Sequence, residues 1–222
     1  MKRIADRDKE SRPARRRLQF GLRTLLLAVA VCAVACSWFA VRKHRANAQR
    51  EAIEALGDHV WVVYDYELDA GGLHIEGAER PGPAWLRNLL GNDFFADAAA
   101  VWGSTDFDDD DMAHLRGFPR LRYLKVFNSR VTDTGLAHLK SLPELENLGL
   151  AGTKITDAGL VHLQQLPRLE AIGLDSTDVT DAGLVRLHDL AGLRRLGLFH
   201  TKATPQGIER LQQALPDCRV WH

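Results

Sequence analysis

A repeat of 24 residues constrains this chain more than any other feature of its sequence. The segments 121–144, 145–168 and 169–192 align without a gap, and seven positions of each unit hold only Leu, Ile or Val. These are the first, fourth, sixth, eleventh, sixteenth, nineteenth and twenty-second positions of the unit. A fixed period of this length indicates a solenoid, in which each unit buries its apolar face against its neighbours.

The apolar spacing changes inside each unit, and this change predicts a strand followed by a helix. Positions four and six, such as Leu148 and Leu150, share one face of a short strand. The last three apolar positions recur every three residues, which is the stripe of a short helix. Thr156 and Asp157 supply an N-cap and an acidic first turn before that stripe. We therefore expect an α/β fold with short parallel strands on a concave face and short helices on a convex face.

The LxxLxL strand and the 24-residue period resemble the leucine-rich repeat family. The VTDAGLxHL half of the unit is similar to the repeats of bacterial leucine-rich repeat proteins and of F-box proteins. The run WLRxLLGxDFF at Trp85–Phe95 is similar to one that often precedes the first repeat in membrane-anchored bacterial members. The resemblance implies a leucine-rich repeat solenoid over most of the chain.

The ninth position of the unit departs from the family pattern, which has Asn or Cys there. It is occupied by Thr105, Ser129, Thr153, Thr177 and Thr201. We expect a ladder of hydroxyl groups that bond the backbone between strand and loop, because an unpaired buried polar group is costly. The alternative is that these are exposed turn residues, since Ser and Thr are common in turns.

The repeat pattern weakens toward both ends, as it does in the capping units of a solenoid. In the unit 97–120 the alignment places Ala100 and Trp102 at the inward strand positions, and Asp97 replaces the first Leu. The tail Cys218–Trp221 is predicted to add a last short strand, with the Cys buried in the cap.

An uncharged run of eighteen residues, 24–41, lies well before the repeats. As a helix it is about 27 Å long, enough to cross the hydrocarbon core of a membrane. Nine Lys or Arg residues precede it and four follow closely, which favours a cytoplasmic N-terminus and a repeat domain outside the cytoplasm. We interpret the run as a signal anchor. Cleavage after Ala33–Ala35 and lipidation of Cys36 remain as alternatives, and each would also export the repeats.

The sequence thus predicts five segments. They are a basic cytoplasmic segment (1–23), a transmembrane signal anchor (24–41), a juxtamembrane helix or linker (42–58), an N-terminal cap (59–96), and leucine-rich repeats with a C-terminal cap (97–222).

Charge and motifs exclude several classes of function. Residues 1–50 carry thirteen Lys or Arg against three Asp or Glu, whereas 51–222 carry sixteen against twenty-six. A basic head on an acidic body is not the pattern of a nucleic-acid-binding domain. The aspartates at 108–111 fit the N-cap and first turn of the first helix. The sequence has no phosphate loop, nucleophile motif or paired metal motif, so we expect no enzyme, no cofactor, no metal and no small-molecule substrate.

Strand positions three, five and seven are predicted to form a partner-binding surface on the concave face. The candidate residues are Tyr123, Lys125, Phe127, Asn147, Asp175, Arg195 and Phe199. Gly149, Gly173 and Gly197 lie in a row between them, and a shallow groove of this kind suits a protein or peptide. The leading hypothesis is a membrane-tethered interaction module for an unknown partner. The alternatives are a self-associating cell-envelope protein and F-box-like substrate recognition, which an exported body argues against.

Overall fold

A computed structural model describes residues 21–69 and 72–222, and the chain divides into two compact units, Met1–Ala40 and Val41–His222. Most of the predicted basic segment 1–23 lies outside the described residues. Helix α1 (Leu22–Leu56) begins in the first unit and ends in the second. Among the described residues it is the one helix long and apolar enough to cross a membrane, judged by length and composition.

The second unit, which we call the repeat body, is built on a seven-stranded sheet whose strands follow one another in chain order. β1 (Val60–Tyr64) runs antiparallel to β2 (Ala98–Gly103), and all later neighbours are parallel. The later strands are β3 (Tyr123–Lys125), β4 (Asn147–Gly149), β5 (Ala171–Gly173), β6 (Arg195–Gly197) and β7 (Arg219–Trp221). From β3 onward the partners are one repeat apart, as in Leu124 opposite Leu148. Each repeat of the sequence is therefore one coil of the solenoid.

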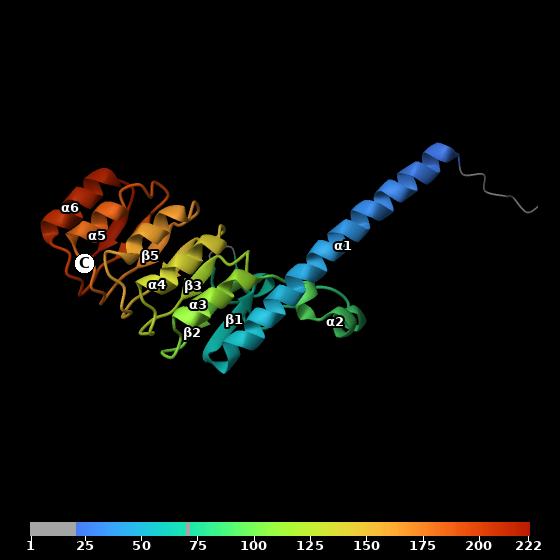
Figure 1. The fold of residues 1–222 in the computed structure, drawn as a ribbon, viewed down its shortest axis with the longest axis horizontal. Coiled ribbons are helices and arrows are strands. Elements are labelled where there is room, and N and C mark those ends of the chain that lie inside the picture. Colours follow the sequence, from blue (N-terminus) through green and yellow to red (C-terminus); the bar gives the residue numbers. More distant parts are fainter. Residues whose placement is uncertain (1–20, 70–71) are drawn as a thin grey trace, which may run out of the picture. The chain divides into compact units, whose positions relative to one another are not determined.

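Short helices form the return path of each coil, and Figure 1 shows them following one another along the body from green to red. They are α3 (Asp109–His114), α4 (Asp133–Leu136), the 3₁₀ helix η6 (Gly159–Gln165), α5 (Asp181–Arg186) and α6 (Pro205–Ala214). The short 3₁₀ helices η4 (Leu115–Gly117) and η5 (Ala137–Ser141) extend the first two. All the repeated Leu, Ile and Val positions of the three aligned units are buried between strands and helices. This confirms the predicted α/β fold with parallel strands.

The first coil differs from its predicted alignment by one residue. β2 pairs with β3 in the register Ala100↔Tyr123, Val101↔Leu124 and Trp102↔Lys125. Val101 therefore occupies the inward fourth position, where the alignment had wrongly placed Ala100, and Trp102 lies beside Lys125 on the other face. A shift of one residue turns every side chain of a strand to the opposite face. The first coil has one residue fewer between its strand and Phe107, and the gapless alignment could not show this.

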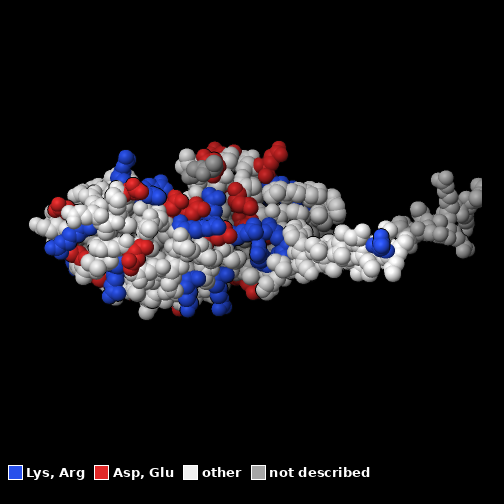
Figure 2. All heavy atoms as spheres, turned by 90° about the horizontal axis from the view of Figure 1, so that it is seen from above, with Lys and Arg blue, Asp and Glu red and all other residues white. Residues whose placement is uncertain are grey.

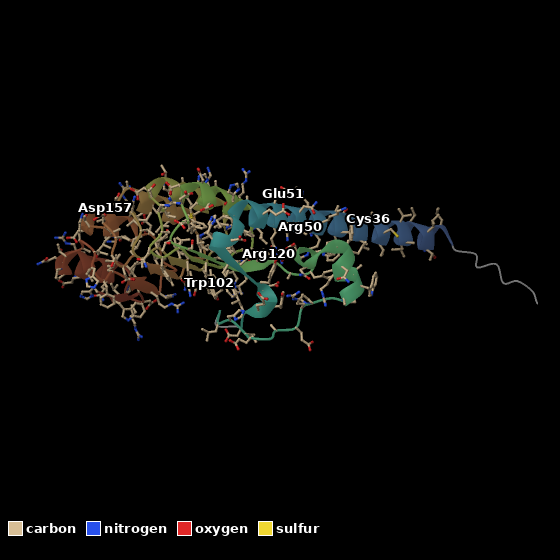
Figure 3. The ribbon with its side chains drawn as sticks, turned by 90° about the horizontal axis from the view of Figure 1, so that it is seen from below. Cys36, Arg50, Glu51, Trp102, Arg120 and Asp157 are labelled. Carbon is tan, nitrogen blue, oxygen red and sulfur yellow. The ribbon has the colours of Figure 1, made fainter. Side chains whose placement is uncertain are left out.

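Asp97, which the alignment placed at the first apolar position, is instead the anchor of an ion-pair cluster. Ala98 takes the apolar position and is buried in the core. Arg42 Nη1 lies 2.7 Å from both carboxylate oxygens of Asp97, and Arg42 Nε donates to the Phe94 carbonyl at 2.5 Å. Arg120 Nη1, whose residue is labelled in Figure 3, donates to the same carboxylate at 2.8 Å. The cluster fastens the start of the body's part of α1 to the first coil.

The segment 42–58 is helical as far as Leu56 and forms part of the packed body. Its buried residues are Ala46, Gln49, Ala52 and Leu56. Any side chain at Gly117 of the first coil would come within 2.5 Å of the Ala52 methyl group and 2.7 Å of the Ala48 carbonyl. This close approach requires glycine, and it explains how the helix covers the open end of the solenoid.

The described residues of the rest of the cap form four short helices. One of them is α2 (Ala84–Leu90), with Pro83 at its N-cap. The others are the 3₁₀ helices η1 (Gly57–His59), η2 (Asp65–Glu67) and η3 (Asn92–Phe94). The predicted last strand after Cys218 is β7, and Cys218 is buried.

Candidate functional site

The sheet register places four of the seven predicted concave residues, Tyr123, Lys125, Asn147 and Arg195, in two rows, whereas Phe127, Asp175 and Phe199 follow the ends of their strands. Successive strands place Tyr123, Asn147, Ala171, Arg195 and Arg219 opposite one another in the first row. The second row contains Trp102, Lys125, Gly149, Gly173, Gly197 and Trp221. These positions alternate with the buried core residues, so both rows lie on the face away from the helices. The structure thus adds three residues to the predicted surface, Trp102, Arg219 and Trp221.

The N-terminal part of this face is occupied by contacts within the chain. Arg122 Nη2 donates to Tyr123 Oη at 2.9 Å, and its guanidinium lies 5.2 Å from the centre of that ring. The backbone at Gly72 lies against the same ring, so that any side chain at this left-handed glycine would overlap Tyr123. The Lys125 ammonium group lies 5.5 Å from the ring centre of Trp102. These predicted partner-binding residues are therefore already engaged.

The glycine row is not bare, contrary to the expected open groove. The ring of Phe127 rests on Gly149, in the space that any side chain there would need. The Asp175 carboxylate lies over Gly197 in the same way and accepts a hydrogen bond from the Phe199 backbone N–H at 2.9 Å. Gly173 is the uncovered member of the row: the nearest atom to a side chain there would be the Asp175 carboxylate, at 3.7 Å.

The C-terminal part of the concave face presents exposed aromatic and basic side chains. Phe199 is 47% exposed and Trp221 is 39% exposed. Arg195 and Arg219, which pair as neighbours on β6 and β7, are both exposed. We call Arg195, Phe199, Arg219 and Trp221 the C-terminal concave cluster. Arg, Trp and other aromatic residues provide most of the energy at protein interfaces when they are buried by a partner.

Hydroxyl groups at the ninth position form hydrogen bonds within their own coil and are not part of the concave face. Thr153, Thr177 and Thr201 each donate to the carbonyl three residues earlier, at 2.6, 2.6 and 2.9 Å. The Ser129 hydroxyl is buried and has no hydrogen-bond partner among the described residues. Thr105 is exposed, because the shortened first coil places it in the turn before Phe107. The bonds thus run within a coil, from loop to strand end.

A second ladder, which the sequence analysis missed, joins neighbouring coils on the helical side. One Asp of each coil accepts hydrogen bonds from both the backbone N–H and the hydroxyl of a Thr in the next coil. The pairs are Asp109–Thr132, Asp133–Thr156, Asp157–Thr180 and Asp181–Thr204, with every distance between 2.6 and 2.8 Å. We call this series the carboxylate ladder, and Asp157 is labelled in Figure 3. The helix glycines, Gly135, Gly159, Gly183 and Gly207, leave the space that each carboxylate fills.

At the first and last carboxylates of this ladder, Asp109 and Asp181, hydrogen bonds favour the ionised form. Burial acts to raise the pKa of Asp109, but hydrogen bonds from Thr132 and its neighbours outweigh burial and hold the pKa below its usual value. Hydrogen bonds from the side chain and backbone of Thr204 lower the pKa of Asp181. In the first coil, Asp108 takes the predicted N-cap role and accepts from the N–H groups of residues 110 and 111.

We also searched the described residues for a metal site and for a reactive thiol. No group of three His, Cys, Asp or Glu side chains among them is arranged to hold a metal ion. Burial raises the pKa of the Cys218 thiol, which makes it a poor nucleophile. On the face shown in Figure 2, Lys and Arg are interspersed with Asp and Glu over the repeat body.

Coils of 24 residues, each with a short parallel strand, a short helix and an inward row of Leu, define the leucine-rich repeat fold. An internalin of Listeria monocytogenes is 20% identical, with a TM-score of 0.43 over 50% of this chain and 30% of its own. A second internalin of that species is 18% identical, with a TM-score of 0.40 over 53% of this chain and 52% of its own. A leucine-rich repeat protein of Leptospira interrogans is 20% identical, with a TM-score of 0.40 over 64% of this chain and 40% of its own.

The aligned region spans about half or less of each of these solved structures. No protein-family model matches the chain, and no curated protein matches it. The assignment of the fold therefore rests on the coil geometry.

Proposed function

We propose that this chain is an exported leucine-rich repeat protein, tethered to the membrane, that binds a protein or peptide on its concave face. The observation that supports this most is the C-terminal concave cluster. It presents Arg195 and Phe199 on and beside β6, and Arg219 and Trp221 on β7. The uncovered Gly173 lies next to it, so the backbone of a partner can approach the sheet closely. Because the backbone of a strand is already ordered, a partner that binds there does not have to order a loop.

The tether is assigned to residues 24–41, with the N-terminus in the cytoplasm and the repeats outside. The positions of α1 between Leu22 and Ala40 are all exposed, which suits a helix surrounded by lipid. A reporter active only outside the cytoplasm should be active when fused after His222. Activity only from a fusion to Met1 would contradict this orientation. Mass spectrometry of the protein from membranes distinguishes an intact chain from one cleaved after Ala35 or lipidated at Cys36.

The binding face is tested with the repeat body, residues 41–222, as bait for a partner. The fragment should begin at Val41, because Arg42, Ala46 and Gln49 pack into the cap. Arg195→Ala combined with Phe199→Ala should weaken binding by about 2 kcal/mol or more for each anchor.

The control variants separate this face from the rest of the surface. Tyr123→Ala with Phe127→Ala should have a smaller effect, because Tyr123 is already covered. Glu209→Ala with Arg210→Ala, both exposed on α6, should leave affinity unchanged. Equal affinity in all three folded pairs would move the site away from the concave face.

Self-association is the competing function, and sedimentation of the repeat body alone separates the two. A monomer over the concentration range of the binding assay supports the proposal. Dimers that dissociate when Phe199 is replaced by Ala would show that the cluster joins copies of this chain.

A further inference from the structure

Two large apolar side chains lie exposed on one face of α2. Trp85 is 69% exposed and Leu89, four residues later, is 72% exposed, so they lie one above the other on the helix surface. Leu89 is the most exposed large apolar side chain among the described residues of the repeat body. Leu86 and Leu90, each one residue further along, are less exposed, which indicates that the adjoining side of the helix faces the cap. The exposed pair therefore lacks a covering element within the described chain.

The end of α2 is joined to the part of α1 that directly follows the apolar run. Arg50 Nη2 donates to the Leu90 carbonyl at 3.5 Å, and Arg50 Nε lies 3.5 Å from Asp93 (Arg50 is labelled in Figure 3). Gln49 Nε2 donates to Asp93 at 3.1 Å. Residues 42 to 50 form about 12 Å of helix, and the apolar run ends at residue 41. The exposed face of α2 is thus held close to the point where the chain would leave a bilayer.

The charges around this surface suit an anionic layer. Lys43 and Arg50 are exposed on α1, and Arg87 lies on α2, where it donates to the carbonyls of Arg80 and Gly82. The nearby carboxylates of Asp93 and Asp97 are paired with Arg50 and Arg42, and their side chains are only 12% and 11% exposed. Trp, Leu and basic residues together are typical of helices that lie at the membrane–water interface.

We infer that α2 is a membrane-contact surface, on which Trp85 and Leu89 enter the interfacial layer of the same membrane that residues 24–41 span. Lys43 and Arg87 would then face the phosphates of anionic lipids, whereas the charge of Arg50 is already paired with Asp93. This inference rests on the proposed tether. The tether keeps α2 next to the bilayer, so even a small apolar surface acts at a high effective concentration. A second copy of the chain would bring like charges together at this site.

The experiment uses the full chain in vesicles. Its three cysteines are replaced (Cys32→Ala, Cys36→Ala and Cys218→Ala), and a single nitroxide is attached through Leu89→Cys. Collisions with oxygen, which enters lipid, and with a water-soluble nickel complex are compared by electron paramagnetic resonance. Val185→Cys is the matched control, because Val185 is also apolar, exposed and helical but lies on α5.

The inference predicts more oxygen than nickel collisions at position 89, and the reverse at position 185. The difference at position 89 should grow when phosphatidylglycerol is added to phosphatidylcholine vesicles, and it should shrink at high salt. If the nickel complex collided with the label at position 89 more than oxygen did, in protein that resists carbonate extraction, the membrane contact would be overturned and the tether would stand. Release of the protein by carbonate would overturn both. A label shielded from both reagents, with dipolar broadening, would show contact with a second copy and would also overturn the inference.

Discussion

Replacing Gly159 by Ala tests whether the carboxylate ladder fixes the spacing of the coils. In the interior of an α-helix, Ala is favoured over Gly by about 1 kcal/mol. Gly159 is the first residue of the 3₁₀ helix η6, so this value is the upper limit of the stabilisation expected if nothing opposed the methyl group. In the structure the added methyl carbon would overlap an Asp133 carboxylate oxygen and lie 3.0 Å from both Asp133 Cγ and Leu136 Cδ1. We therefore expect a loss of stability where helix propensity alone predicts a gain.

The magnitude follows from the bonds that Asp133 makes. Its carboxylate accepts from the Thr156 N–H at 2.8 Å and from the Thr156 hydroxyl at 2.6 Å. Hydrogen bonds to charged groups contribute about 1.5 kcal/mol each at the lower end, which suits this half-buried site. Losing both bonds costs about 3 kcal/mol, and because the helix-propensity gain is at most about 1 kcal/mol, the net loss should be about 2 kcal/mol or more. In an Asp133→Ala background the bonds are already lost, so Gly159→Ala should gain up to about 1 kcal/mol.

The assay is urea unfolding of the repeat body, followed by far-ultraviolet circular dichroism, for the wild type, both single variants and the double variant. The coupling free energy between the two sites should be about 3 kcal/mol, far above the usual error of additivity. Gly192→Ala is the control, because the nearest atom to a methyl group there is the Leu169 carbonyl at 3.5 Å. If Gly159→Ala changed stability equally in both backgrounds, the carboxylate would not be what excludes a side chain at 159.

Three further predictions use the same unfolding assay. Leu148→Asp should cost several kcal/mol because it buries an unpaired charge in the core, and wild-type stability would show that the fourth position does not face inward. Asp97→Leu should lower the free energy of unfolding by about 3 kcal/mol, because it leaves Arg42 unpaired. Adding Arg42→Met should restore part of that stability. A double variant less stable than Asp97→Leu alone would contradict the ion pair's role. Because the pKa values of Asp109 and Asp181 are lowered, their contribution is complete above the unfolded aspartate pKa, about 3.9, and is lost as the pH falls through the lowered values. Asp109→Asn should therefore start less stable at neutral pH and lose less on acidification, whereas an unchanged acid response would contradict the assignment.

The core was predictable because each inward position repeats in every unit with the same kind of side chain. The register of the first coil was not predictable, because its strand reads AAAVWG and small residues fit either face of a strand. Its register depends on β1, which pairs with it from the other side, and on the Phe107 ring, which fills the space above Gly103. Both are contacts between segments that a gapless alignment treats separately.

The concave surface was predictable as a set of positions but not as a set of free side chains. Strand alternation is enough to place Phe127 and Tyr123 on that face. It does not show that the Phe127 ring lies on the next strand, or that the loop at Gly72 reaches Tyr123, because these contacts depend on side-chain direction and loop path. The carboxylate ladder did leave a signal in the sequence: a Thr, an Asp and a Gly keep a fixed spacing in successive units, as in Thr156, Asp157 and Gly159.

The two faces of the solenoid differ in what constrains the type of residue at each position. The inward row and the carboxylate ladder hold nearly the same residue types in every coil, because each coil must present the same interface to the next. The first concave row instead reads Tyr123, Asn147, Ala171, Arg195 and Arg219, so side-chain size and charge change from coil to coil without changing the register. A surface that varies this way is not required for stacking. Substitutions at Arg195 or Arg219 should therefore leave stability nearly unchanged, and a loss of binding there can be attributed to the partner contact rather than to unfolding.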